Sequence, residues 1–445
     1  MEEFRDALRS FVVEACKFLA AQPIGQRQWI RIVRIVKESV EHTSFPVELR
    51  PDFSEPLFHW TVRLLVQESM PSFRRLVDVV RASDKLRGTL LVDDLGKPTP
   101  DESHKQLLFR VVWRFMNSWV NKAKGVQFDE RTFQVLWDDL VHDIESPTIK
   151  VTKFSPLFNL ELDSPEVTID AGVRLFELPA EELESLLNAN DLLPSHPLTK
   201  QDILRLRCAV EVVYEQHRHS DQSQAALDAR NKLLRLMTAV RLLSEGTPCV
   251  AFTRVSTSSW LNSGTSWESS PAHWGANATI RRSEEPELIR LFARLTASPN
   301  ASRVELALGR WNSAGDRSTE ADRLIDHWVA LESLFGPRDK QELSFRMPLR
   351  IAAFLGADGP ERQRIFNEMR DSYDLRSKIV HGSDGKSKKT TLSQSLTLVR
   401  SYLKRALLKI LLSDEKFDAE KLEIGLLSRE NVLCSKAEFE GSAGI

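Results

Sequence analysis

The 445-residue sequence is poor in glycine and cysteine and has almost no net charge. Its 18 glycines favour helices over turn-rich β architectures. Because its cysteines are scattered without a C-x-x-C pair, we expect buried free thiols in place of a disulfide framework or a zinc cluster. The formal net charge of −2 excludes a histone-like coat for nucleic acid, so any nucleic-acid site must be a local basic patch. The cysteines are Cys16, Cys208, Cys249 and Cys434.

Long apolar runs and familiar catalytic motifs are also missing. No segment reaches the roughly 18 consecutive apolar residues of a membrane helix, and the acidic, amphipathic start MEEFRDALRSFVVEACKFLA does not have the pattern of a signal peptide. We therefore expect a cytoplasmic protein without a membrane partner. The absence of G-x-x-x-x-G-K-[ST], G-x-G-x-x-G, H-E-x-x-H and G-x-S-x-G removes the usual support for NTPase, Rossmann, zincin and α/β-hydrolase classes.

The length and the apolar content indicate two or three folded domains. Because a domain typically has roughly 100–200 residues, a chain of 445 residues needs more than one hydrophobic core, and its 42% of hydrophobic residues is enough to build several. We expect a mainly α protein. Its predicted parts are an all-α N-terminal domain (1–145), an α+β middle region (146–300), a C-terminal antiparallel helical bundle (301–413) and a peripheral tail (414–445).

Apolar spacing predicts the individual elements. Recurrence at three and four residues predicts successive helices before residue 145, with one stripe at Leu8, Phe11, Val12, Ala15 and Leu19 and another at Trp29, Ile32, Val33 and Val36. In the middle region, β-branched segments predict strands at 148–158, 158–162, 167–175 and 248–256, around a helix at 225–243. Residues 203–213 fit a strand or a helix. In the C-terminal region, Leu324, Trp328, Leu331 and Phe335 form another helical stripe.

A polar segment at 256–277 carries three tryptophans spaced by seven residues. Gly264, Pro271 and Gly275 exclude a coiled coil. Exposed tryptophans could stack on nucleic-acid bases, but packing of a long surface loop is the commoner role. The tryptophans are Trp260, Trp267 and Trp274.

The strongest candidate site follows a helix predicted at 361–380. That helix begins after Asp358-Gly-Pro and ends at Gly382, where a left-handed cap belongs. His381 precedes this glycine, so the helix dipole stabilises its imidazolium at the helix end. Between Arg376 and Lys409 the sequence has nine Lys and Arg residues against one acidic residue, a patch suited to a phosphate backbone or to a solvated helix face. Those chosen as RNA-binding candidates are Lys378, Lys386, Lys388, Lys389, Lys404 and Arg405.

Five short motifs in this region match one family in order. They are ALGRWN (307–312), DRLID (322–326), ALESLF (330–335), RIAAFLG (350–356) and YDLRSKIVHG (373–382). Over residues 303–412, about a quarter of the chain, the sequence resembles the Apea-like branch of HEPN domains.

The resemblance implies an antiparallel helical bundle that dimerises, and a metal-independent endoribonuclease of toxin and antiviral systems. It places Arg376 and His381 at the catalytic positions and Glu332 at a supporting acidic position. Tyr373 and Ser377 belong to the same motif, and much of the wider superfamily has Asn where this chain has Ser377. No metal or other cofactor is implied.

The chemistry of these residue types agrees with that activity. Cleaving RNA without a metal needs a base for the 2′-hydroxyl, an acid for the 5′-oxygen and cations for the phosphate. Histidine can serve as base or acid at neutral pH, and arginine grips phosphate bidentately. One Arg and one His per chain supply half of this requirement, so we expect a homodimer whose two-fold axis completes the site. RNA is the expected partner, with a phage or host trigger sensed by the N-terminal and middle regions.

Other functions remain open. The basic patch also suits a non-catalytic dimerisation and RNA- or nucleotide-binding module, or, less well, a helical adaptor in which Arg376 and His381 only stabilise the fold. A metal site at Asp138, Asp139, His142 and Asp143 is less favoured than a solvated helix face, and His217 with His219 has the same status.

Overall fold

The computed structural model describes twelve segments of the chain: residues 1–21, 32–35, 49–52, 70–92, 97–123, 127–192, 198–218, 224–260, 266–269, 275–337, 341–382 and 391–428. They belong to two compact units. The first comprises Met1–Leu157, Ala171–Leu233 and Val250–Ser270, and the second Phe158–Asp170, Leu234–Cys249 and the chain from Pro271 onward. The predicted middle region contributes to both units, and the domain boundaries expected at residues 146, 301 and 414 stay a prediction.

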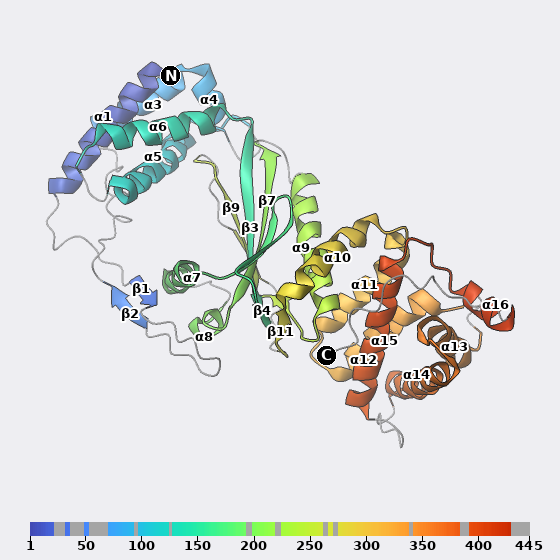
Figure 1. Ribbon diagram of the computed structural model, residues 1–445. Helices are drawn as coiled ribbons and strands as arrows, with labels where there is room; N and C mark the ends of the chain where they lie inside the picture. The colour runs from blue at the N-terminus through green and yellow to red at the C-terminus, as the bar shows by residue number, and fades with distance from the viewer. Residues whose placement is uncertain are drawn as a thin grey trace. The chain divides into compact units, whose positions relative to one another are not determined.

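Amphipathic helices form the N-terminal part of the first unit (Figure 1). Their apolar stripes share one core that includes Phe11, Phe115 and Phe133, as the helical spacing predicts. Side-chain caps begin two of them: Ser83 accepts from Leu86 N, and Asp129 accepts from Thr132 N. The helices are α1 (Glu2–Ala21), α3 (Pro71–Ala82), α4 (Asp84–Leu90), α5 (Asp101–Ala123) and α6 (Glu130–Glu145).

The prediction that residues 1–145 are entirely helical is wrong at two short segments. Strands β1 (Ile32–Ile35) and β2 (Leu49–Asp52) pair antiparallel, with Ile32 opposite Asp52. Three of the four residues in β1 are β-branched, which favours a strand, and their alternation competes with the helical spacing in so short a segment.

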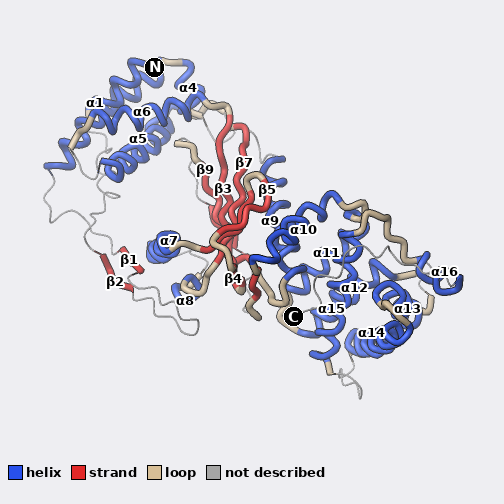
Figure 2. Tube along the Cα trace, viewed as in Figure 1, coloured by secondary structure: helices blue, strands red, loops and turns tan. Residues whose placement is uncertain are grey.

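An antiparallel sheet forms the rest of the first unit and is drawn in red in Figure 2. Within this unit its strand order is β10–β9–β3–β7–β6. The ambiguous segment at 203–213 is resolved as a strand from residue 208 onward, where β7 begins, after short helix α8 has ended at Ile203. The elements are β3 (Thr148–Phe158), β6 (Val173–Glu177), α7 (Ala180–Leu192), α8 (Lys200–Ile203), β7 (Cys208–His217), β9 (Phe252–Thr257) and β10 (Ser266–Ser269). The sheet confirms the α+β character predicted for the middle region.

The single strand expected at 167–175 is divided in two. β5 (Glu166–Asp170) ends before a turn, and β6 begins after Gly172. Gly172 has a φ of +74°, and a Cβ on it would lie 2.5 Å from the carbonyl oxygen of Val213. Only glycine fits both the left-handed backbone and this close approach.

Helices make up most of the second unit. Helix α12 carries the predicted apolar stripe, and its residues Leu324, Trp328, Leu331 and Phe335 are fully buried. Two short strands, β4 (Leu160–Leu162) and β11 (Ala278–Ile280), pair in parallel. The helices are α10 (Glu285–Ala297), α11 (Ala301–Gly315), α12 (Glu320–Phe335), α13 (Leu343–Leu355), α14 (Gly359–Val380), α15 (Leu392–Leu412) and α16 (Glu420–Ser428). Helix α9 (Gln224–Leu243) begins in the first unit and ends in the second. Strand β8 is Cys249–Val250.

Residues 414–428 are not peripheral, although the sequence predicted a peripheral tail. The Phe417 ring lies 5.0 Å from the ring of Phe354 in α13. Glu423 of α16 accepts hydrogen bonds from Arg346 at 3.1 Å and from Arg350 at 2.7 Å. The Arg350 side chain is 1% exposed, so Glu423 supplies the counter-charge that a buried guanidinium needs.

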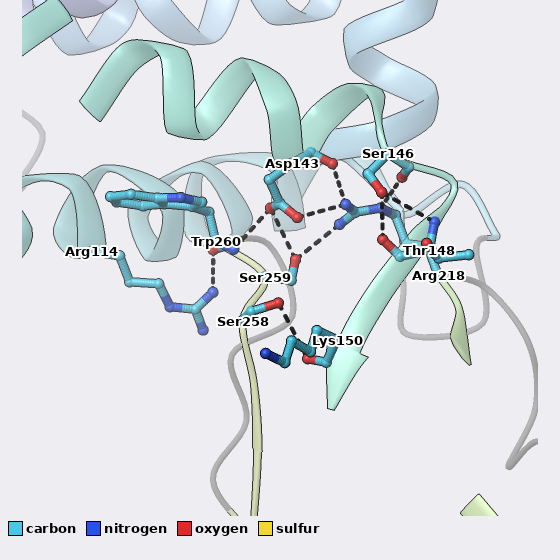
Figure 3. Close-up of polar contacts among 9 residues, drawn as sticks. All are labelled: Arg114, Asp143, Ser146, Thr148, Lys150, Arg218, Ser258, Ser259 and Trp260. Carbon is cyan, nitrogen blue, oxygen red and sulfur yellow. Dashed lines mark hydrogen bonds and ion pairs between the residues drawn. The ribbon is translucent and has the colours of Figure 1, made fainter. Parts of the chain in front are cut away.

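A buried polar cluster lies among α6, β7 and the chain after β9 in the first unit (Figure 3). The Arg218 guanidinium forms an ion pair with Asp143 at 2.7 Å, and the two side chains are 5% and 12% exposed. Arg218 also donates to Ser259 Oγ at 2.9 Å. Asp143 further accepts from Ser259 Oγ at 3.0 Å and from Trp260 N at 2.8 Å. Asp143 is therefore a structural anchor and is not part of a solvated helix face.

Trp260 packs on the helical core of the first unit. Its ring centroid lies 5.8 Å from that of Phe115, and its carbonyl accepts a hydrogen bond from Arg114. This is the packing role that the sequence favoured over stacking on bases. The side chains of Trp267 and Trp274 lie outside the described residues.

We expect Arg218→Met to lower the free energy of unfolding by about 3–5 kcal/mol, because it leaves the Asp143 carboxylate buried without a counter-charge. Urea denaturation followed by tryptophan fluorescence measures this loss. Lys85→Met is the control, since its partner Glu145 and Lys85 itself are more than half exposed, at 51% and 56%, and such a pair contributes at most about 1 kcal/mol. Equal losses in the two variants would contradict the buried character of the pair.

Candidate functional site

Helix α14 carries the residues that the sequence selected as a site. The Asp358 side chain caps its start by accepting from Glu361 N at 2.8 Å, and a proline occupies its first turn. The helix ends at His381, followed by Gly382 with a φ of +72°. These ends agree with the predicted signals and place Arg376 in the last turn.

Arg376 pairs with Glu332 of α12. Its Nη2 atom lies 3.0 Å from Oε1 of Glu332, and the two side chains are 20% and 29% exposed. Its Cζ lies 5.8 Å from the centroid of the Tyr373 ring, within the range of a cation–π contact. The structure therefore brings together three of the five predicted site residues.

The Nε atom of Arg376 is buried and makes no hydrogen bond within the described part of the chain. A buried donor of this kind costs about 1–3 kcal/mol when it is left without an acceptor. Such a group needs a physical explanation.

Tyr373 lies at the side of this ion pair. Burial raises the pKa of its hydroxyl, and the Glu332 carboxylate raises that pKa further, while Arg376 lowers it. The phenol therefore stays protonated at neutral pH, as a neutral neighbour of the guanidinium.

His381 and its neighbours are more accessible. The His381 side chain is exposed, and its backbone N–H donates to the Ser377 carbonyl at 3.1 Å. Five residues separate Arg376 from His381, which corresponds to about 7.5 Å along a helix axis. Lys378 is exposed in the same turn.

A chain of buried polar side chains holds α14 between two other helices. Trp328 of α12 donates from Nε1 to Ser372 Oγ at 3.1 Å, and Ser372 Oγ lies 2.6 Å from Ser395 Oγ of α15. The sequence reasoning missed these serines. A signal was present, because Ser372 occupies the apolar stripe of α14 between Met369 and Leu375.

The patch between Arg376 and Lys409 contains nine basic residues. Four of them donate hydrogen bonds to carbonyls at the ends of neighbouring helices. Lys404 Nζ donates to the Leu243 carbonyl at 3.1 Å, and Arg400 donates to the Glu245 carbonyl at 2.8 Å, just after α9. At the end of α13, Lys409 donates to the Phe354 carbonyl at 2.7 Å, and Arg405 to the Leu355 carbonyl at 3.3 Å. Cations at helix C-termini satisfy orphan carbonyls and oppose the negative end of the dipole.

The remaining RNA-binding candidates are Lys386, Lys388 and Lys389, which lie outside the described residues.

Two of the other polar candidates, Asp138 and Asp139, contact side chains of this chain, and His142 is exposed. Asp138 accepts from Gln134 at 2.6 Å, and Asp139 lies 3.9 Å from Lys122 Nζ. In the described segments, no group of three or more His, Cys, Asp or Glu side chains is arranged to hold a metal ion. His219 lies beyond the described part. Cys16, Cys208 and Cys249 are buried, as expected, and Cys434 is not among the described residues.

His327 lies buried at the contact between α11 and α12. It is 4% exposed, and its ring centroid is 5.4 Å from that of Trp311. Burial, with a smaller contribution from the nearby Arg400, lowers the pKa of His327 to about 3, although the Asp326 carboxylate opposes the shift. The imidazole is therefore neutral in the folded protein at any physiological pH.

Comparison with protein-family models, with curated proteins and with solved structures found no match to this chain. Among the described helices, none combines the length and the apolar character that crossing a membrane requires.

We expect Lys404→Met to lower the free energy of unfolding by about 1–2 kcal/mol, because it removes the cation from the end of α9. The Lys404 side chain is only 14% exposed, whereas the control Lys378→Met changes an exposed residue and should leave the stability within about 0.5 kcal/mol. Thermal denaturation by circular dichroism compares the two. A larger loss in Lys378→Met would contradict the capping role.

Stability should also fall as the pH is lowered below 6.5. The folded-state pKa of His327, about 3, lies below the ordinary value, so the unfolded chain binds one more proton between these two values. This contributes a loss of about 1.4 kcal/mol per pH unit on going down through that window, and nothing above it. His327→Phe should remove this contribution, which urea denaturation at pH 7.5 and pH 5 measures. Equal slopes in wild type and variant would show that His327 is not the group responsible.

Proposed function

We propose that the C-terminal helical region is a metal-independent endoribonuclease of the HEPN type, in which Arg376 and His381 are catalytic. The observation that carries the proposal is the state of Arg376. Glu332 holds its guanidinium at 3.0 Å while its Nε–H is buried without an acceptor in the described chain. Arginine binds phosphate well, and the Arg376 side chain keeps 20% of its surface exposed, so a phosphate can approach it from solvent.

The reaction needs one proton removed and one proton supplied. A histidine takes the proton of the ribose 2′-hydroxyl, and the 2′-oxygen attacks the adjacent phosphorus. The bond to the 5′-oxygen breaks, and a second histidine protonates that leaving oxygen. The products are a 2′,3′-cyclic phosphate and a free 5′-hydroxyl. Each chain supplies one Arg376 and one His381, so a homodimer provides both histidines and two cations for the phosphate.

The rest of the chain has a regulatory role in this proposal. About 300 residues precede the helical region that carries Arg376, which is far more than a nuclease bundle needs. We assign to them the sensing of a phage or host trigger and the restraint of the nuclease, as in antiphage or abortive-infection defence. This part rests on the order of the regions along the chain and on the family resemblance.

A second candidate function is a non-catalytic module that dimerises and binds RNA or nucleotides. The Arg376–Glu332 ion pair favours it, because the carboxylate supplies a counter-charge to the guanidinium without any substrate. The two functions differ in whether His381 is needed for a chemical step.

We expect purified protein to cleave total RNA and tRNA in the presence of EDTA, and expect Arg376→Ala and His381→Ala to lower the rate at least 100-fold, the lower end of what general acid–base catalysis contributes. Gel analysis of the RNA and identification of 2′,3′-cyclic phosphate ends measure this. His142→Ala changes an exposed histidine of α6 in the first unit and should cleave like wild type. RNA binding without cleavage in all four proteins would favour the non-catalytic module, and full activity of His381→Ala would exclude the proposed mechanism.

A further inference from the structure

The ion pair between Arg376 and Glu332 occupies the part of the guanidinium that a phosphate needs. Nη2 of Arg376 lies 3.0 Å from Oε1 of Glu332. A guanidinium grips an oxyanion through one of two edges, the side edge of Nε and Nη2 or the end edge of Nη1 and Nη2. Because Nη2 belongs to both edges, an incoming phosphate meets the negative charge of Glu332 at either of them.

The side edge of Arg376 is closed for a second reason. Its Nε atom is buried and has no hydrogen-bond partner in the described chain, so a ligand does not reach it from solvent. The Arg346–Glu423 pair of the same unit shows the full use of a side edge, because Glu423 accepts from Nε and from Nη2 of Arg346, each at 3.1 Å. Glu332 contacts Arg376 without satisfying Nε. Arg376 is therefore held in a conformation that does not offer two parallel donors to a phosphate.

The net free energy that holds Arg376 in this conformation is small. Both side chains of the pair keep part of their surface in solvent, 20% for Arg376 and 29% for Glu332, and a partly exposed ion pair contributes little. The Tyr373 ring, 5.8 Å from Cζ of Arg376, adds a cation–π contact. The unpaired Nε–H opposes both, because a buried donor without an acceptor is unfavourable. A competing anion therefore needs only a modest advantage to draw the guanidinium away from Glu332.

We propose that Glu332 is an electrostatic latch, which occupies Arg376 in the resting protein and releases it when a phosphate of the RNA strand binds. The released guanidinium then offers both atoms of its end edge to the phosphate. Glu332 is thus a competitor of the substrate, and it lowers the apparent affinity for RNA by the fraction of the protein in which Arg376 is released. The identity of the anion, an RNA phosphate, rests on the proposed function.

Removing the carboxylate should tighten RNA binding. The measurement is fluorescence anisotropy with a labelled 12-nucleotide RNA, on full-length protein that carries His381→Ala so that the RNA stays intact. We expect Glu332→Gln in this background to tighten binding about three- to fivefold, because a partly exposed ion pair shifts an equilibrium by a factor of about that size. A carboxylate that only positions Arg376 for the phosphate would have the opposite effect, a loss of affinity when it is removed.

Glu361→Gln is the matched control, because it removes the same charge from another ion-paired glutamate of this unit. Glu361 lies 3.3 Å from Arg405 and is 24% exposed, close to the 29% of Glu332. It precedes Arg376 by fifteen residues, about 22 Å along α14, so it does not touch the latch. This variant should change the RNA affinity less than about twofold. A gain equal to that of Glu332→Gln would show that overall charge is responsible and would overturn the latch.

A second measurement follows the guanidinium itself and needs no RNA. Phenylglyoxal modifies accessible arginine side chains, and mass spectrometry of the peptides gives the rate at each arginine. We expect Glu332→Gln to raise the rate at Arg376 by about threefold or more, the same factor by which the ion pair holds it. The rate at Arg364, which is 60% exposed, should stay unchanged. Inorganic phosphate should slow the labelling of Arg376 more in this variant than in wild type, because the carboxylate no longer competes.

Unchanged labelling of Arg376 together with unchanged or weaker RNA binding in Glu332→Gln would overturn the latch. Cleavage by the wild type is measured separately. If RNA is neither bound nor cleaved, while Arg376 is labelled faster in Glu332→Gln and protected by phosphate, the proposed nuclease is wrong and the latch stands for another ligand that carries a phosphate.

Discussion

Two successive contacts between α12 and α14 determine the geometry of the candidate site. Trp328 bonds to Ser372, and one turn later Glu332 pairs with Arg376. Both pairs advance by four residues, so the two helices run in the same direction and keep one register. Ser395 continues the first contact to α15. Because the first contact is fully buried and the second is partly exposed, the buried pair sets the position at which the guanidinium meets solvent.

Counting charges along the chain overstates the basic character of the C-terminal region. Arg400, Lys404, Arg405 and Lys409 occur as two pairs, and each pair bonds to the carbonyls that end another helix. Their spacing along α15 looks like a phosphate-binding stripe in the sequence. Whether these residues bind phosphate or cap other helices depends on what α15 packs against, which is a property of the tertiary structure and not of the local sequence. A positive patch in a helical region is therefore weaker evidence for nucleic acid than its net charge indicates.

Local signals predicted much of the fold, whereas contacts between distant residues were not predictable. The cap at Asp358, the stop at Gly382 and the apolar stripe of α12 each act within a few residues, and the structure confirms them. The pairs Asp143–Arg218 and Arg350–Glu423 join residues more than 70 positions apart, and no spacing rule links them. For the same reason the tail was expected to be peripheral, because nothing near Glu423 shows that a buried arginine requires it.

Several motif residues behind the family resemblance have packing roles in this chain. Asp326, 3% exposed, accepts from Arg310 at 3.1 Å and from Arg317 at 2.8 Å and so joins α11 to α12. Arg350 of another motif donates to the Phe335 carbonyl at 3.0 Å. Such residues would be needed for packing with or without catalysis. The argument for chemistry therefore depends on the few residues without a complete structural role: Arg376, with its unsatisfied buried Nε–H among the described residues, and the exposed His381.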